Sequence, residues 1–293
     1  MNRTYEYKVV DVFTSRALQG NPVAVVLDAD GLSTESMQAI AHWTNLSETT
    51  FVLPPTSAEA DYKLRIFTPR SELPFAGHPT LGSAHAILEA QGSKARFVRL
   101  VQECEFGLVE VSVENEAGNS KATLALPEAH FKNLDADDVA ELEAILGYEF
   151  TGPVAPAIVN VGAVWVIARL DSAASVLELR PDFARLAEFE RRLGVTGLTV
   201  FGHHEQGGEA TIEVRTFAPS CGVEEDPVCG SGNGSVAVFQ RERKLLSPQG
   251  AKYVAAQGQQ VGRDGRVHVT VDAGGAVHIG GSCVTGVAGT LTL

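Results

Sequence analysis

The chain has 293 residues, 44% of them hydrophobic, so it can fill a core and is not disordered as a whole. Its net charge of −13 at pH 7 argues against a nucleic-acid surface, which needs clustered Lys and Arg, and against an anionic membrane surface. A small anionic ligand stays compatible with this charge, because a local site can be positive within an acidic protein.

The first half of the chain predicts a mostly antiparallel sheet with two helices. One helix starts after Ser33, a good N-cap, and carries Glu35 in its first turn. The other starts at Pro79, which suits a first helical position, and stops at Gly92. Alternating apolar residues predict strands at 5–13, 22–27, 50–53, 62–67, 108–113 and 122–126.

The second half predicts a similar set of elements. One helix is capped by Asp135 and ended by Gly147, another covers 181–193, and a third follows Gly232. Strands are predicted at 157–160, 164–169, 198–201, 211–217, 267–271, 276–279 and 290–293. Helices within a mostly antiparallel sheet, used in both halves, indicate an α+β architecture.

The chain also repeats itself, which indicates two similar domains. Residues 65–69 (RIFTP) recur as 215–219 (RTFAP), and a short acidic loop follows each copy. The other matching segments are 20–26 with 162–167, 46–52 with 195–201, and 77–84 with 230–237. The shared order indicates one fold written twice. We expect domains at 1–128 and 129–293, with the last strand free to pack back on the first domain.

Targeting segments, disulfides and metal sites are not expected. The longest apolar runs fall far short of the roughly 18 residues of a membrane span, and residues 1–13 lack an apolar signal core. The 4 cysteines are too few and too scattered for a disulfide scaffold, and no pair has zinc-ribbon spacing. We therefore expect a soluble, cytoplasmic protein.

Two glycine-rich turns, Gly77–His78 and Gly230-Ser231-Gly232, each begin a predicted helix. Such a turn presents unpaired backbone N–H groups and the positive end of a helix dipole, which suit a carboxylate or a phosphate. One such turn alone is more simply a structural turn, but two at equivalent positions favour a shared site for a small anion. A dinucleotide site is not expected, because 230–234 reads G-x-G-x-G instead of G-x-G-x-x-G.

Two candidate catalytic side chains lie in the first half. Glu48 breaks the symmetry of the repeat, because its counterpart is Gly197. A carboxylate among apolar neighbours has a raised pKa and can serve as acid and base, and the alternative is a solvated loop glutamate. His78 can bind a ligand or relay a proton, or it can simply cap its helix.

Two further candidates lie in the second half. Asp226 can hold a substrate amine or orient His78, or it can belong to a solvated acidic turn. Cys229 can act as a thiolate acid and base at a helix N-terminus, or it can fill a small buried space. Ser231 is expected to be the N-cap of its helix.

The motifs together resemble the PhzF family, the phenazine-biosynthesis isomerase-like group of the diaminopimelate epimerase superfamily. They are 45–52 (NLSETTFV), 77–80 (GHPT), 225–232 (EDPVCGSG), and 11–13 (DVF) followed by 20–22 (GNP). The likeness covers essentially the whole chain. It implies two pseudo-symmetric α+β domains, each wrapping a sheet around a central helix. It further implies a cofactor-free active site between them and a homodimer.

The resemblance also implies roles for individual residues. In the family's isomerase, the glutamate of the S-E-T motif shuttles a proton between two carbons of trans-2,3-dihydro-3-hydroxyanthranilate, and Glu48 matches it. The family's Gly-His pair matches Gly77 and His78. Its Asp and Ser in the D-P-x-x-G-S motif match Asp226 and Ser231.

One departure from the family pattern bears on the chemistry. PhzF proteins have Thr where this chain has Cys229, and the superfamily's amino-acid epimerases have a catalytic cysteine in both turns. The first turn here has Ala76 at that place, which makes a two-thiol racemase unlikely on sequence grounds. A Glu48/Cys229 pair stays possible and would indicate epimerase-like chemistry.

These observations predict a cofactor-independent isomerase of a small, carboxylate-bearing substrate. Backbone N–H groups of Gly77–His78 and of Gly230, Ser231 and Gly232 would hold the carboxylate. Glu48 would move the proton, while Asp226 and His78 would position the substrate. The alternatives are an epimerase that uses Glu48 and Cys229, and a non-catalytic protein that binds a small anion on the same fold.

Overall fold

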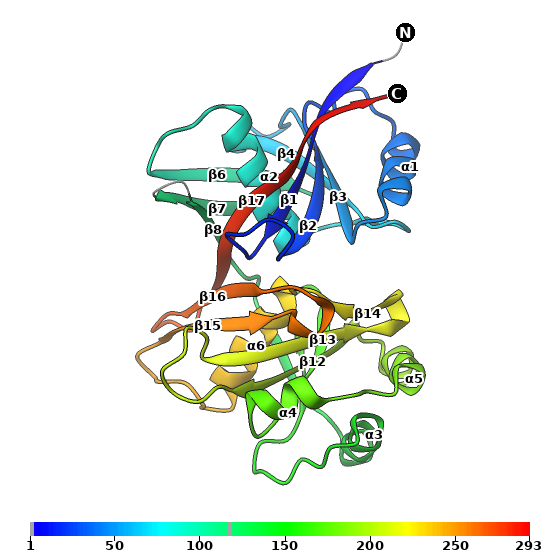
Figure 1. Cartoon of the computed structure of the whole chain (residues 1–293), viewed down its shortest axis with the longest axis vertical. Coiled ribbons are helices and arrows are strands. Elements are labelled where there is room, and N and C mark those ends of the chain that lie inside the picture. Colours follow the sequence, from blue (N-terminus) through cyan, green and yellow to red (C-terminus); the bar gives the residue numbers. More distant parts are fainter. Residues whose placement is uncertain (1–2, 117–118) are drawn as a thin grey trace. The chain divides into compact units, whose positions relative to one another are not determined.

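The computed structural model describes residues 3–116 and 119–293, which fall into two compact units (Figure 1). Unit 1 runs up to Ala125 and includes Gly280–Leu293, and unit 2 is Leu126–Ile279. The division follows Ala125, whereas the sequence analysis set it between 128 and 129. The last strand continues from unit 2 into unit 1, so the C-terminal segment completes the first unit.

Unit 1 contains two helices, α1 (Thr34–Thr44) and α2 (Gly77–Ala90). Its strands are β1 (Thr4–Val12), β2 (Asn21–Val26), β3 (Glu48–Leu53), β4 (Tyr62–Phe67), β5 (Glu72–Leu73), β6 (Phe97–Cys104), β7 (Gly107–Glu116), β8 (Asn119–Ala125) and the greater part of β17 (Val277–Thr292).

The strands of unit 1 form a sheet that closes on itself. β1 pairs antiparallel with β17 and with β2, β2 pairs parallel with β3, and β3 pairs antiparallel with β4. β4 pairs antiparallel with β5 and parallel with β6, and β6, β7 and β8 follow one another in antiparallel order. Because β8 also pairs with β17, the ring of strands is complete.

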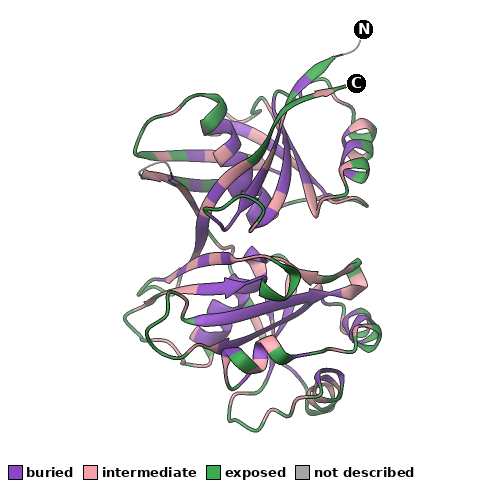
Figure 2. Ribbon diagram, viewed as in Figure 1, coloured by how far each residue is buried: buried purple, intermediate pink, exposed green. Residues whose placement is uncertain are grey.

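Helix α2 lies inside this ring, and its sequence explains why it can. Its sequence is rich in small residues (GHPTLGSAHAILEA). Most residues of the helix are buried, among them Leu81 and Ser83 (Figure 2). A Cβ at Gly82 would lie 2.4 Å from Cγ1 of Val23 on β2, so glycine is needed for the close approach of helix and strand. The helix contacts β1, β2, β3, β7 and β8.

Helix α1 covers the outside of the same sheet. Its N-cap is Ser33, as expected, with the hydroxyl accepting from the Ser36 N–H at 3.2 Å. It ends at Asn45, which has the left-handed conformation (φ 54°) that a helix C-terminus often uses. Met37 and Ile40 pack against Phe51 and Phe67 in a core cluster.

Unit 2 contains α3 (Ala136–Leu146), α4 (Ala173–Glu178), α5 (Phe183–Leu193), α6 (Gly230–Glu242) and two 3-10 turns, η1 (Pro219–Cys221) and η2 (Gln259–Val261). Its strands are β9 (His130–Asn133), β10 (Ala157–Asn160), β11 (Val164–Arg169), β12 (Gly197–His203), β13 (Ile212–Ala218), β14 (Val223–Asp226), β15 (Ala251–Gln257) and β16 (Gly265–Val271).

The strand pairings of unit 2 repeat those of unit 1 in the same order. β10 and β11 are antiparallel, β11 and β12 parallel, and β12 and β13 antiparallel. β13 then pairs antiparallel with β14 and parallel with β15, which pairs antiparallel with β16. Helix α6 takes the place of α2 and contacts β10, β11, β12 and β16. The internal repeat is therefore a repeat of topology, and the α+β fold class is confirmed.

Several elements differ from the sequence prediction. Strands β5, β6, β9, β14 and β15 and helix α4 were not predicted, because they are short or lack a regular alternation of apolar and polar residues. Helices α2 and α6 begin at Gly77 and Gly230, earlier than expected, so the glycines of both turns lie within the first helical turn. Asp135 is the N-cap of α3, but its side chain makes no capping hydrogen bond.

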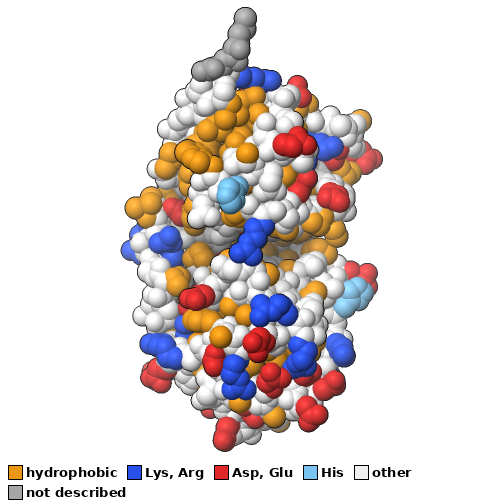
Figure 3. Space-filling model, turned by 90° about the vertical axis from the view of Figure 1, so that its right-hand side faces the viewer, with side chains coloured by type: hydrophobic (Ala, Val, Ile, Leu, Met, Phe, Trp, Pro, Cys, Tyr) orange, Lys and Arg blue, Asp and Glu red, His pale blue; other side chains and the backbone are white. Residues whose placement is uncertain are grey.

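The surface carries mixed charges. On the face shown in Figure 3, acidic and basic side chains are interspersed and do not form one basic patch. Among the described residues, no helix is both long and apolar enough to cross a membrane.

Candidate active site

In unit 1, Glu48 and His78 lie together. Glu48 is the first residue of β3, and His78 is the second residue of α2. His78 Nε2 is 3.3 Å from Glu48 Oε2, and the two side chains are 8% and 15% exposed. The structure thus brings together the two residues that the sequence predicted as the acid–base group of this half.

Burial determines the charge of His78. Loss of water around the ring lowers the pKa of His78 to about 3, so the imidazole is neutral at physiological pH. The ring also hydrogen-bonds the backbone of Pro22. Since proline has no N–H, the bond must run from the ring to the Pro22 carbonyl.

This bond fixes the tautomer of His78. Nε2 is the ring nitrogen that faces Glu48, so Nδ1–H is the donor to Pro22 and Nε2 carries a lone pair. Two lone pairs would face each other if the Glu48 oxygen were ionised. A neutral His78 therefore places a lone pair, and no positive charge, beside the Glu48 carboxyl.

The turn that begins α2 is fixed by its own helix and by β6. Its N-cap is Ala76, and no side chain among the described residues caps it. The Thr80 hydroxyl donates to the Ala76 carbonyl at 2.9 Å and accepts from Gln102 Nε2 at 3.1 Å. A helix N-terminus without a side-chain cap keeps backbone N–H groups available for a ligand.

In unit 2, the corresponding turn gathers Asp226, Cys229 and Ser231. Cys229 is the N-cap of α6, with Sγ accepting from the Gly232 N–H at 3.3 Å. The prediction that Ser231 is the N-cap is therefore wrong, because the helix starts one residue before it. Gly232 is tightly enclosed: a Cβ there would lie 2.8 Å from Thr199 Oγ1.

The pKa of the Asp226 carboxyl is raised toward neutral pH. Removal from water raises the pKa of Asp226 to about 6, although the Val228 N–H and the Cys229 side chain hydrogen-bond it and oppose the shift. The Val228 bond to Asp226 Oδ1 measures 3.0 Å. Because the thiol is the donor to Asp226, Cys229 is engaged at both its hydrogen and its sulfur.

Gln257 on β15 holds the turn as a whole and was not predicted. Its Oε1 accepts from the Cys229 N–H at 3.1 Å and from Asn233 Nδ2 at 2.7 Å. Its Nε2 donates to the Asp226 carbonyl at 3.0 Å. One buried amide thus ties both ends of the turn together, but its strand gave no sequence signal that would have revealed it.

Other polar clusters of unit 2 lie outside this turn. His204 Nε2 is 3.0 Å from Glu213 Oε2, and burial raises the pKa of Glu213 to about 7. No group of three or more His, Cys, Asp or Glu that could hold a metal occurs in the described part of the chain.

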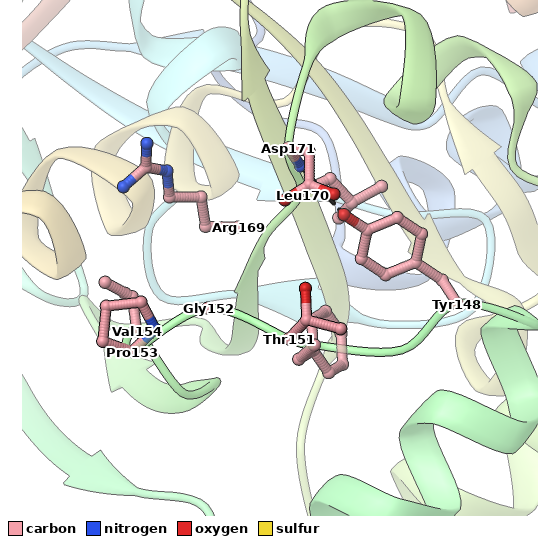
Figure 4. A pocket seen from close by; sticks show the side chains of 9 residues that line it. Tyr148, Thr151, Gly152, Pro153, Val154, Arg169, Leu170 and Asp171 are labelled. Atoms are coloured by element: carbon pink, nitrogen blue, oxygen red, sulfur yellow. Dashed lines mark hydrogen bonds between the residues drawn. The ribbon is translucent and has the colours of Figure 1, made fainter.

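A separate pocket of about 200 Å³ opens in unit 2 beside the end of β11 (Figure 4). It is lined by Tyr148 and by residues 150–154 and 169–171. The Tyr148 hydroxyl accepts from the Asp171 N–H at 2.9 Å on one side of this pocket. It includes none of the predicted site residues.

Comparison with known proteins assigns the class of the molecule. A sheet closed around a helix, used twice, is the diaminopimelate epimerase-like fold, and solved structures of that fold match the chain. The family model for phenazine biosynthesis-like proteins, PhzC-PhzF, matches residues 10–289. The chain therefore belongs to the PhzC–PhzF family, and it is an isomerase.

Individual relatives match over nearly their whole length. Antisense-enhancing sequence 1 of Schizosaccharomyces pombe is 39% identical over 97% of this chain and 98% of its own. A trans-2,3-dihydro-3-hydroxyanthranilate isomerase of Pseudomonas aeruginosa is 36% identical over 95% and 96%. The crystal structure of a PhzF family phenazine biosynthesis protein from Bacillus anthracis has a TM-score of 0.86 at 25% identity, covering 99% and 100%.

Proposed function

We propose that this isomerase moves a proton between two carbons of a small, carboxylate-bearing substrate without a cofactor. The observation that carries the proposal is the contact of Glu48 with a neutral, buried His78. In that pair Glu48 starts as an acid, since Nε2 of His78 has no proton of its own to share. A relative at 36% identity is named for such a substrate, trans-2,3-dihydro-3-hydroxyanthranilate.

The proton transfer balances in two steps. Glu48 gives its proton to one carbon of a conjugated substrate, whose π electrons form the new C–H bond. The resulting carboxylate then takes a proton from a second carbon, and the electrons of that C–H bond restore the conjugation. Because the carboxylate is transiently beside the His78 lone pair, the step that returns a proton to Glu48 is favoured.

We also propose how the substrate is held. The backbone N–H groups of Gly77 and His78, and those of Gly230, Ser231 and Gly232, suit a carboxylate or developing negative charge. With its pKa of about 6, Asp226 suits an amine or hydroxyl, as acceptor or donor. The family resemblance supports a homodimer, which sedimentation analysis of the purified protein tests.

The test of the proposal is Glu48→Gln, assayed with trans-2,3-dihydro-3-hydroxyanthranilate. The amide keeps the shape but cannot exchange the proton, so kcat should fall by about 10²- to 10⁴-fold. Glu35→Gln, the same substitution at an exposed site on α1, is the matched control and should leave turnover unchanged. Turnover by Glu48→Gln at the wild-type rate would refute the proposal.

The epimerase alternative makes a different prediction. Two bases, Glu48 and Cys229, would incorporate solvent deuterium at an inverted centre, and Cys229→Ala would abolish that inversion. The hydrogen bonds of Cys229 to Asp226 and Gly232 argue against it as a free base. A non-catalytic anion-binding protein would keep both its ligand and its phenotype in Glu48→Gln.

A further inference from the structure

The internal repeat places two different residues at the position of the acid–base group. In unit 1, β2 and β3 run parallel with Val23 beside Glu48. In unit 2, β11 and β12 run parallel in the same register, with Trp165 beside Gly197. The two strand pairs are therefore equivalent, residue for residue, although one ends in a carboxylate and the other in a glycine.

The backbone of β13 and the Trp165 ring together explain why glycine occupies the second position. A Cβ at Gly197 would lie 2.1 Å from the Phe217 carbonyl oxygen and 2.8 Å from Cζ3 of Trp165. No side chain fits there, and the indole covers the side of Gly197 that the backbone leaves. The indole itself is buried, with 4% of Trp165 exposed.

The indole also contacts the residue that corresponds to His78. Gly77 and Gly230 are equivalent helix starts, so His78 and Ser231 both lie at the second position of their helices. Trp165 Nε1 donates to Ser231 Oγ at 3.0 Å, where Glu48 approaches His78 at 3.3 Å in the first unit. Each half thus has one polar contact from its sheet to the second residue of its central helix. In unit 1 the contact is between a carboxyl group and an imidazole, and in unit 2 it is between an indole N–H and a hydroxyl.

The direction of this hydrogen bond determines what Ser231 can do. Indole N–H is a donor only, so the Ser231 oxygen must accept, and its single hydrogen is left to point elsewhere. Cys229 Sγ lies 3.6 Å from the Ser231 oxygen, and sulfur is a weak acceptor. A substrate carboxylate is a far stronger acceptor and would take that hydrogen.

We infer that Trp165 is a positioning residue that makes Ser231 a dedicated hydrogen-bond donor for the substrate carboxylate, and that its ring acts with the Phe217 backbone in excluding a base from position 197. The inference rests on the proposed function in placing that carboxylate at the α6 turn. It goes beyond that proposal in giving the two halves separate tasks: proton transfer in unit 1 and carboxylate recognition in unit 2.

Calorimetric titration with anthranilate tests this inference, because anthranilate carries a carboxylate and an amine but cannot be isomerised. Trp165→Phe keeps an aromatic ring at this position but loses the N–H donor and part of the buried indole. We expect it to weaken binding about three- to tenfold, and Ser231→Ala to weaken it about ten- to a hundredfold. Trp165→Phe should have no further effect in the Ser231→Ala background, because its effect acts through the hydroxyl.

Two controls separate positioning from damage to the fold. Trp43→Phe changes the exposed indole of α1 and should leave binding unchanged. The Trp165 indole N–H signal in a proton NMR spectrum should move upfield in Ser231→Ala, as expected when that N–H loses its acceptor. Additive effects of the two variants, wild-type affinity in Trp165→Phe, an unmoved indole signal, or no anthranilate binding at all would each overturn the inference.

The outcome is independent of the acid–base test. If Glu48→Gln keeps full turnover while the Trp165 and Ser231 variants still lose anthranilate together, the proposed function fails and the positioning role stands. If Glu48→Gln is inactive and Trp165→Phe binds normally, the reverse holds.

Discussion

The two units contain the same arginine–glutamate pair at two depths, which allows the cost of breaking it to be predicted against an internal control. Arg215 on β13 and Glu225 on β14 are joined by two hydrogen bonds of 3.0 and 2.8 Å, and their side chains are 5% and 8% exposed. Arg65 and Glu72 form the equivalent pair in unit 1, but are 23% and 31% exposed.

Burial determines how much each pair matters. Arg215→Gln removes both bonds to Glu225 and leaves a carboxylate with little water around it. It also removes the bonds from Arg215 Nη1 to the carbonyls of Val176 and Leu179, at 3.1 and 2.9 Å, which fix α4. Losing one partner of a buried ion pair costs about 3–5 kcal/mol. Arg65→Gln leaves a carboxylate that water can reach, and should cost about 1 kcal/mol.

Urea unfolding followed by circular dichroism gives the two free energies, and hydrogen-exchange mass spectrometry assigns each loss to its unit. We expect Arg215→Gln to raise exchange in β13, β14 and α4, and Arg65→Gln to affect unit 1 weakly. An equal or greater loss in Arg65→Gln would refute the reasoning, because it would mean that burial does not set the cost. Unchanged exchange around Glu225 would do the same.

Two further predictions concern the α6 turn and its neighbourhood. The native pKa of Asp226, about 6, exceeds the ordinary 3.8, so the folded state holds this proton more tightly and the free energy of unfolding falls as pH rises from about 4 to 6. Asp226→Asn should make that decline smaller by the contribution of Asp226, while the raised pKa of Glu213 keeps its own part, as measured by urea unfolding at pH 4, 5, 6 and 7; a decline equal to wild type would contradict the assignment. Gly197→Ala should lower stability by at least 1–3 kcal/mol, the usual range for overpacking, since its Cβ would meet the Phe217 carbonyl at 2.1 Å. Gly152→Ala, at a position with nothing within 4 Å, is its control, and an equal loss in both variants would rule out the steric explanation.

The fold was largely predictable because the internal repeat allowed the elements predicted in one half to be compared with those predicted in the other. Short recurring segments such as RIFTP and RTFAP located equivalent strands, and glycine-rich turns located the central helices. The missed strands are very short or, as in β6 and β15, lack a strict alternation of apolar and polar residues, so periodicity did not reveal them. The start of α6 was misplaced because a cysteine is an unusual N-cap, and Ser231 looked like a better one.

The site was predictable only as a set of residue types. The contact of Glu48 with His78 follows from β3 and α2 meeting at one end of the sheet, which the sequence did not reveal. The roles of Pro22, Gln257 and Trp165 depend on tertiary hydrogen bonds. A signal for Trp165 was nevertheless present: in the aligned repeats it occupies the place of Val23, beside the position where Glu48 changes to Gly197. A bulky residue gained next to a side chain lost is the pattern of one volume exchanged for another.

That exchange bears on how an asymmetric reaction arises from a symmetric fold. Two equivalent carboxylates would offer a proton from either unit, and the second would also place negative charge near the turn proposed to bind the substrate's carboxylate. Glycine at position 197, with the Trp165 ring packed beside it, leaves no carboxylate in unit 2 that could carry this charge. The indole N–H supplies a neutral donor in its place, and this aligns Ser231 without any group that could accept a proton from carbon. The difference between the halves is consistent with the proposed single mobile proton on Glu48, a mechanism in which Cys229, hydrogen-bonded to Asp226 and Gly232, is not a second base.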